Sequence, residues 1–357
     1  MQYSLSECSK KDFQATCHHL HNQTHDRCDD LKAILDEIKS EVQHSQFSNE
    51  DEKDNAMYVV LEACNHIAAW KSHQLRTINQ EKAKHDAMSA LDEQTVLITQ
   101  DWAMKFLPQH YRESQGNWFA KRGMSWHLSY VTTKKEGSLQ SQCFIHIIDK
   151  CKQESSIVVP IMENVLAQLK AENPDINKAY YRSDNAGCYH SINTVLSCPT
   201  ISKRTGIHIH RYDFSDPQGG KGPCDRYSAI VKSHVRIYLN EGHDIVTPKD
   251  FKEAMESHHR IPGVRVTLVE EDICDPGIDN KYEGISSLNN FLYNEKGIRA
   301  WQAFSIGKGQ FLPWSNFKGK DILKTREAII VSSDMSVIIK LFISIKSFFI
   351  AQAELLQ

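Results

Sequence analysis

The sequence lacks several features that would assign it to a functional class at once. Its 42 Lys and Arg stand against 45 Asp and Glu, so the formal charge of −3 offers no overall attraction to DNA or to an anionic membrane. Residues 1–13 hold no apolar run of the length that a secretory leader needs, which predicts an intracellular protein. The ten cysteines are scattered, unlike a compact disulfide framework, and this agrees with a reducing compartment.

Long uncharged apolar runs are also missing. The most apolar segment is the tail 326–357, where Asp334, Lys340 and Lys346 interrupt every run before it reaches about 18 residues, so no membrane span is expected. A buried helix and a frayed chain end are two open interpretations of this tail. The segment "GGKGP" lacks the Ser or Thr that follows Lys in a phosphate-binding loop, so a nucleotide site around Lys221 is not expected.

A helical period runs through residues 29–92. Leu31, Ile34, Leu35 and Ile38 recur at helical spacing, and a second stretch from about residue 50 begins with acidic residues, which favour a helix N-terminus. We expect a helical arm here. Two uses of it remain open: the helices pack onto the rest of the chain as a bundle, or they form a homodimer.

The pattern changes to strands from residue 94. The runs "TVLITQDWAM", "MSWHLSYVTTK" and "SQCFIHIIDK" predict three strands, and the next segments alternate as helix, strand, helix, strand and helix up to residue 245. This order predicts an α/β domain over residues 93–245, with one mixed sheet flanked by helices. Further strands such as "GVRVTLVEE" predict a small C-terminal α+β extension over residues 246–325.

Three aspartates occupy particular places in this order. Asp101 closes the first strand, Asp184 closes the fourth in "YYRSDNAG", and Asp225 opens the helix after the fifth in "GGKGPCDRYSAIVK". Each of them alone is typical of a turn or a helix start, where Asp is favoured. Carboxylates at the ends of adjacent strands would instead converge at one edge of the sheet, where α/β proteins bind their ligands.

The element order and these motifs resemble the RNase H-like core of DDE/D transposases and retroviral-type integrases. The step "SDNA" is similar to the second-acid motif of integrases, and Gly-Lys-Gly-x-Cys-Asp before a helix resembles transposon-derived proteins of animal genomes. The resemblance implies that Asp101, Asp184 and Asp225 are catalytic ligands of two Mg²⁺ or Mn²⁺ ions, which clamp a phosphodiester for cleavage and strand transfer on DNA. Cys188 and His190, beside Asp184, are interpreted as structural.

The segment 1–28 is rich in cysteine and histidine. In "CHHLHNQTHDRC" the side chains of Cys17, His19, His21 and Cys28 are of the types that a closed tetrahedral zinc site uses. The related transposon proteins carry a Cys-x-x-Cys pair at its end, whereas this chain has "CDDL", with Cys8 as a further possible ligand. A bound Zn²⁺ and a solvated polar segment are the two interpretations.

Basic and aromatic side chains alternate in residues 105–123. Such a mixture suits phosphate contact and base stacking. The candidate nucleic-acid contacts there are Lys105, Arg112, Lys121 and Arg122, and Lys221 is a further candidate beside Asp225. The alternative is a structured loop whose aromatic side chains, among them Trp118 and Phe119, belong to the core.

Two main functional hypotheses follow, and a third possibility is a zinc-stabilised interaction domain with no nucleic-acid role. The first is a transposase-derived, DNA-acting and nuclear enzyme that needs Mg²⁺ or Mn²⁺. The second is an inactive descendant that serves as a DNA-binding or protein-interaction module, with the helical arm as its means of association and no membrane partner. Metal-bridging proximity of the three aspartates distinguishes the two hypotheses.

Overall fold

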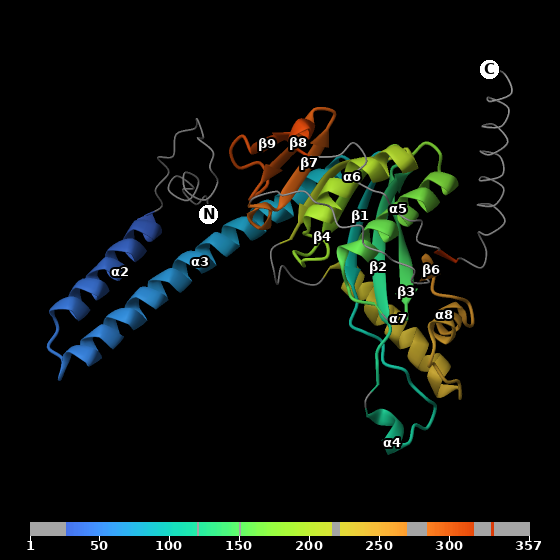
Figure 1. Ribbon diagram of the computed structural model, residues 1–357, viewed down its shortest axis with the longest axis horizontal. Helices are drawn as coiled ribbons and strands as arrows, with labels where there is room; N and C mark the ends of the chain where they lie inside the picture. The colour runs from blue at the N-terminus through green and yellow to red at the C-terminus, as the bar shows by residue number, and fades with distance from the viewer. Residues whose placement is uncertain are drawn as a thin grey trace.

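The computed structural model describes residues 26–119, 121–149, 151–215, 222–269, 284–317 and 330–331 (Figure 1). Its helices are α2 (Asp26–His44), α3 (Glu50–Ser89), α4 (Gln115–Trp118), α5 (Ser155–Glu172), α6 (Ile192–Thr205), α7 (Pro223–Asn240) and α8 (Pro248–Glu256), with short 3₁₀ turns η1 (Ile285–Ser287) and η2 (Trp314–Asn316). Its strands are β1 (Thr95–Trp102), β2 (Ser125–Lys135), β3 (Ser138–Ile148), β4 (Lys178–Ser183), β5 (His208–Phe214), β6 (Val264–Val269), β7 (Asn290–Asn294), β8 (Gly297–Trp301), β9 (Gln310–Pro313) and β10 (Ile330–Val331). Among these helices, none is both long and apolar enough to cross a membrane.

These strands form one sheet in the order β10-β6-β3-β2-β1-β4-β5-β7-β8-β9. β1 pairs in parallel with β4, which pairs in parallel with β5, and β2 runs antiparallel between β1 and β3. The central order β3-β2-β1-β4-β5 with β2 reversed is that of an RNase H-like sheet. The fold class predicted from the sequence is therefore confirmed.

The C-terminal extension completes this sheet on both sides. β6 pairs in parallel with β3 on one side, and β7 pairs antiparallel with β5 on the other, followed by β8 and β9 as an antiparallel meander. The added strands satisfy the backbone N–H and C=O groups that β3 and β5 would otherwise expose at an edge. The extension is thus part of the central layer, although its strands lie far from the core in sequence.

Alternation along β1 assigns the two faces of the sheet. Val96 and Ile98 pack in the main core with α5 and α6, whereas Leu97 packs on the other face with the end of α3. A further core on that second face joins β2 and β3 to α7 and α8. Because side chains alternate with a period of two, Asp101 lies on the same face as Leu97, between α3 and α7.

The arm is a hairpin of α2 and α3 that extends away from the sheet (Figure 1). α3 begins where the Asn49 side chain accepts a hydrogen bond from the Glu52 N–H, at 2.8 Å. Two helices bury only one seam, and apolar side chains on the outside of the hairpin remain exposed, among them Ile34 at 52% and Val59 at 56%. The C-terminal end of α3, by contrast, packs closely on the sheet, with Ala83 and Ala87 fully buried.

Arg211 of β5 holds the end of α3 to the sheet. Its guanidinium donates to the Ala83 carbonyl at 2.7 Å, to Asp86 at 2.6 Å and to Asp213 at 2.9 Å. Arg211 and Asp213 each expose 3% of their side chains, so their charges are nearly fully removed from water. A buried ion pair of this kind costs desolvation, and it persists because hydrogen bonds satisfy both partners.

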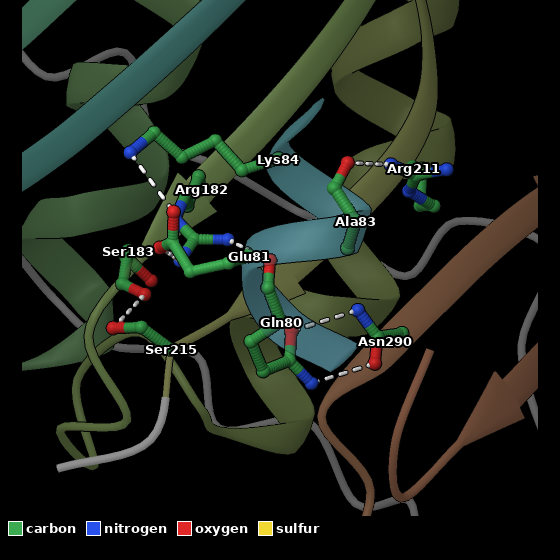
Figure 2. Close-up of polar contacts among 9 residues, drawn as sticks. All are labelled: Gln80, Glu81, Ala83, Lys84, Arg182, Ser183, Arg211, Ser215 and Asn290. Atoms are coloured by element: carbon green, nitrogen blue, oxygen red, sulfur yellow. Dashed lines mark hydrogen bonds and ion pairs between the residues drawn. The ribbon is translucent and has the colours of Figure 1, made fainter. Parts of the chain in front are cut away.

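A second set of contacts continues this network (Figure 2). The amides of Gln80 and Asn290 hydrogen-bond each other at 2.8 and 3.1 Å. Arg182 of β4 donates to the Gln80 carbonyl at 2.8 Å and to Glu81 at 3.1 Å. These contacts fix the last turns of α3 beside β4, two residues before Asp184.

Candidate active site

Asp101 and Asp184 lie at the carboxyl edge of the sheet. Asp101 is the next-to-last residue of β1, and Asp184 follows the last residue of the parallel neighbour β4. The Asp184 carboxylate accepts a hydrogen bond from the Ala186 N–H at 3.1 Å, so it stabilises the turn after the strand. The same carboxylate lines a cavity, and its two roles are compatible because a carboxylate has several acceptor positions.

Asp225 lies in the first turn of α7 and reaches the same cavity. Its carboxylate accepts a hydrogen bond from the Gly222 N–H at 2.7 Å and thereby caps its own helix. The helix start therefore accounts for the orientation of this side chain.

The three aspartates line one cavity of about 510 Å³. Residues of strands β1, β2, β3 and β4 line it, together with residues of helices α3 and α7. Its charged lining residues also include Glu81, Lys84, Arg182 and Arg226. The arm helix is thus part of the cavity, which the sequence did not indicate.

Among the three aspartates, Asp101 is the one whose pKa the cavity raises to near neutral. Burial, with smaller contributions from the nearby charges of Asp184 and Asp225, raises the pKa of the Asp101 carboxyl from 3.8 to about 7. Burial also raises the pKa of Asp184, against the opposing effect of the Ala186 N–H. Asp101 consequently titrates near neutral pH, and a bound cation would favour its charged form.

The carboxylates are not arranged as a complete set of metal ligands. Among the residues with described positions, no group of three or more His, Cys, Asp or Glu side chains could hold a metal ion. The orientation of Asp225 towards Gly222 supplies a physical reason. The donor chemistry nevertheless fits Mg²⁺ or Mn²⁺, because both prefer carboxylate oxygen. The pKa of Asp101 is raised first by burial and then by the charges of Asp184 and Asp225, and a cation would offset the repulsion between these charges.

A second cavity of about 670 Å³ adjoins Asp101 and Asp184 at the edge of the sheet. It is also lined by Glu154, which precedes α5, and by Tyr189. Tyr189 is fully buried, and its hydroxyl has no hydrogen-bond partner among the described residues. Neither residue was predicted from the sequence, because nothing in the local pattern distinguishes Glu154 from an ordinary residue before a helix.

Cys188 and His190 have the surroundings of structural side chains. Burial raises the pKa of the Cys188 thiol to about 11, which keeps it protonated and unreactive. Burial lowers the pKa of His190, whose ring lies 4.5 Å from the ring of Phe214.

The candidate nucleic-acid contacts lie in different surroundings. Lys105, Arg112 and Arg122 are exposed on the loop between β1 and β2. Lys121 exposes only 10% of its side chain, pairs with Glu113 and donates to the Pro108 carbonyl at 2.7 Å, so it holds the loop together. Lys221 lies outside the described residues.

Two sequence expectations about other sites have different outcomes. Cys17, His19 and His21 lie outside the described residues, and so does the side chain of Cys28, so the zinc hypothesis stays a prediction. The alternative that the loop aromatics belong to the core is wrong: Trp118 is 65% exposed and Phe119 is 69% exposed.

The strand order and the three carboxylates around one cavity at the carboxyl edge of the sheet place this protein among the RNase H-like α/β proteins. Within that class the chain belongs to the family described as a domain of unknown function (DUF8701), whose model matches residues 80–287, more than half of the chain. The matched region begins at Gln80, where α3 reaches the sheet, and it contains all three aspartates.

Other comparisons add little. No curated protein matches the chain. Among solved structures, the human cytomegalovirus terminase nuclease domain, soaked with Mn, matches 54% of this chain and 69% of its own, with 9% identity and a TM-score of 0.21. At that TM-score the likeness supports no conclusion about activity, and the fold class rests on the strand order.

Proposed function

We propose that the protein derives from a DDE/D-type transposase and cleaves phosphodiester bonds of DNA with the help of a divalent cation. The observation that supports this proposal is the convergence of Asp101, Asp184 and Asp225 on one cavity, where burial, together with the charges of the other two aspartates, raises the pKa of Asp101 to about 7. Carboxylates that repel one another in a cleft are typical of sites that bind a cation.

Each aspartate has a definite part in the proposed site. Asp101 and Asp184 would hold Mg²⁺ or Mn²⁺ from the ends of two paired strands, and Asp225 would join them after turning away from the Gly222 N–H. When bound, such ions position the attacking and leaving oxygens of a phosphodiester and stabilise the charge that develops on them. Arg226, which is exposed beside Asp225 in the cavity lining, would contact the neighbouring phosphate.

The proposal is tested with wild-type protein, Asp184→Asn and a matched control, Asp54→Asn, which removes one exposed negative charge on the arm. Wild type and the control should nick supercoiled plasmid in Mn²⁺ or Mg²⁺, and they should join a 3′-hydroxyl oligonucleotide to it if strand transfer is retained. Asp184→Asn should do neither.

A binding measurement separates loss of chemistry from loss of the cation. At a hundredfold excess over its dissociation constant, the cation should stabilise the wild-type fold by about 2.7 kcal/mol, seen as a higher midpoint of unfolding. Asp184→Asn should show little or none of this gain. Equal midpoints for both proteins with and without Mn²⁺, together with no cleavage, would refute the metal-dependent proposal.

A second candidate function is that of an inactive descendant acting as a DNA-binding or protein-interaction module. Two observations favour it: Asp225 is engaged in capping its helix, and the arm exposes apolar side chains. At 100° per residue, Ile34 and Ile38 of α2 and Val59 of α3 lie on the same outer face of the antiparallel hairpin. A second copy laid on that face would form a four-helix bundle and bury all three.

This dimer is tested by sedimentation equilibrium. The wild type should sediment as a dimer, and Ile34→Lys with Ile38→Lys should sediment as a monomer with unchanged helix content. A monomeric wild type at micromolar concentration would contradict the proposal.

Two further parts of the hypothesis concern residues and locations beyond the site. We propose that the segment with Cys17, His19, His21 and Cys28 binds zinc, which elemental analysis of purified protein would test, with a Cys17→Ser, Cys28→Ser variant as the metal-free control. Action on chromosomal DNA requires a nuclear location, which imaging of a fluorescent fusion in cells would test.

A further inference from the structure

The connection between β1 and β2 is a long loop of defined structure. Residues 103–124 leave the carboxyl edge of the sheet, carry α4 and return (Figure 1). Its two legs are joined by backbone hydrogen bonds between Phe106 and Met124, at 2.9 and 2.8 Å. They approach so closely that a Cβ on Gly123 would lie 2.8 Å from the Lys105 Cβ, so glycine is required there.

Contacts with the segment after α7 hold the loop in place. Gln109 and Ile245 exchange backbone hydrogen bonds, each of 2.8 Å. The Asp244 carboxylate accepts from the Tyr111 N–H at 2.7 Å and lies 2.9 Å from His110 Nδ1. The loop is thus anchored at both its base and its middle, and its outer side chains are carried on a firm support.

This support presents aromatic rings to water. Trp118 and Phe119, adjacent in sequence, are 65% and 69% exposed, and Tyr111 is 41% exposed. Leaving such rings in water forgoes the stabilisation that their burial would provide. An exposed aromatic group on an anchored loop is typical of a surface that binds another molecule.

The charge of the loop indicates the kind of molecule. Within residues 103–124, four cations, Lys105, Arg112, Lys121 and Arg122, against one acid, Glu113, leave a net charge of +3, whereas the whole chain carries −3. Lys121 and Glu113 pair with each other, so the other three cations account for that charge.

Arg112 has a backbone feature of its own. It adopts a left-handed conformation, with φ of 55°, which is uncommon for a residue with a Cβ. Its guanidinium lies 5.2 Å from the centre of the Tyr111 ring. The strained backbone thus accompanies an exposed cation that is held beside an exposed ring.

We propose that this loop binds an unpaired nucleic-acid strand. Bases would stack on Trp118 and Phe119, and phosphates would pair with Lys105, Arg112 and Arg122. Bases within a duplex already stack on each other, so an aromatic surface selects unpaired ones, and the cations account for the phosphates in either form. The choice of ligand rests on the proposed action on DNA, but binding by the loop needs neither the aspartates nor a metal.

The position of the loop suits a strand that also passes the aspartates. α7 has 18 residues and begins beside the cavity, so it spans roughly 27 Å, and the loop is anchored just beyond its C-terminal end. A strand lying along α7 would thus connect the two regions.

The experiment measures the fluorescence anisotropy of a labelled oligothymidine in EDTA, where metal-dependent cleavage is absent. The double variant Trp118→Ala, Phe119→Ala should bind about tenfold or more weakly than wild type, because it loses two stacking surfaces. The matched control Trp70→Ala removes another exposed tryptophan, on α3, and should bind within about twofold of wild type. Both substituted sites are exposed, so the variants should retain the wild-type thermal unfolding midpoint.

Further arms separate the outcomes. The triple variant Lys105→Ala, Arg112→Ala, Arg122→Ala should lower the slope of log affinity against log salt by roughly 2, for three phosphate contacts to a single strand. Because binding is measured in EDTA, without metal-dependent cleavage, a failure of the cleavage proposal leaves this result intact. Equal binding by wild type and the double variant, or no binding by either, would overturn the proposal.

If the double variant lost as much affinity for duplex DNA as for the single strand, the selection of unpaired bases would be refuted. A change of oligomeric state in the double variant, without a loss of oligonucleotide binding, would assign the rings to a protein contact instead.

Discussion

Removal of the Asp101 charge should change how the stability of the protein depends on pH. Asp101 has a pKa of about 7 in the fold against 3.8 ordinarily. A carboxyl whose pKa is raised by folding contributes fully to stability below its unfolded pKa, and this contribution is lost as the pH rises through the folded value. In the absence of divalent cations, the free energy of unfolding should therefore fall between about pH 4 and pH 7 because of this one group.

The size of the effect follows from the pKa difference. At 1.36 kcal/mol per pH unit, the change from 3.8 to about 7 corresponds to about 4 kcal/mol. Asp101 remains in contact with solvent through the cavity, so an effect of about 2 to 4 kcal/mol is the expectation.

The assay is urea unfolding in EDTA from pH 4 to pH 8.5, with wild type, Asp101→Asn and the charge control Asp54→Asn. Urea leaves the ionic strength unchanged, so the repulsion between carboxylates is retained. Asp101→Asn should gain stability relative to wild type as the pH rises. The free energy of unfolding of Asp54→Asn should change with pH as that of wild type does. Asp184→Asn should remove less than half of the pH dependence, because burial raises the Asp101 pKa more than the Asp184 charge does.

One result would refute this reasoning. If wild type and Asp101→Asn differ by a constant amount across the whole range, within about 0.5 kcal/mol, Asp101 titrates near its ordinary pKa. Neither burial nor the neighbouring charges would then act on Asp101, and the cation proposal would lose its electrostatic support.

Two other predictions concern the fold that supports the site. Arg211→Met should lower the free energy of unfolding in urea by about 3 to 5 kcal/mol, because Asp213 would be left buried without its ion-pair partner. Adding Asp213→Asn should restore part of this loss. A double variant no more stable than Arg211→Met would contradict this account. Burial lowers the pKa of His146 to about 4, so its contribution to stability is complete above pH 6.5 and is lost, by about 3 kcal/mol, as the pH falls from 6.5 to 4. In urea unfolding, His146→Gln should lose less stability than wild type between pH 6.5 and pH 4, whereas the exposed control His66→Gln should lose as much as wild type. An equal loss in His146→Gln and wild type would show that another group is responsible.

Much of the fold could be predicted because it depends on local patterns. Alternation in "TVLITQDW" and helical spacing in "SSIVVPIMENVLAQLKAE" identify a strand and a helix without reference to the rest of the chain. The order of these elements then restricts the topology, because parallel neighbours need a crossover helix. The same order predicted that Asp101 and Asp184 would lie at one edge of the sheet.

Other features of the site required long-range contacts. The end of α3 lines the cavity because Arg182 and Arg211, which are more than 90 residues away in sequence, donate hydrogen bonds to its carbonyl groups and hold it on the sheet. The orientation of Asp225 depends on a choice between its own helix N-terminus and the cavity, and the nearby Gly222 N–H decides it.

The sequence by itself determined the elements, their order and the places of the three aspartates along the chain, since these follow from periodicity over a few residues. The tertiary structure alone decided that the C-terminal strands complete both sides of the sheet, because pairing depends on which edges remain open once the centre has formed. It also decided that Trp118 and Phe119 face water, because the loop that carries them is anchored outside the core, through Asp244. Burial is a property of the assembled surfaces, and composition alone does not specify it.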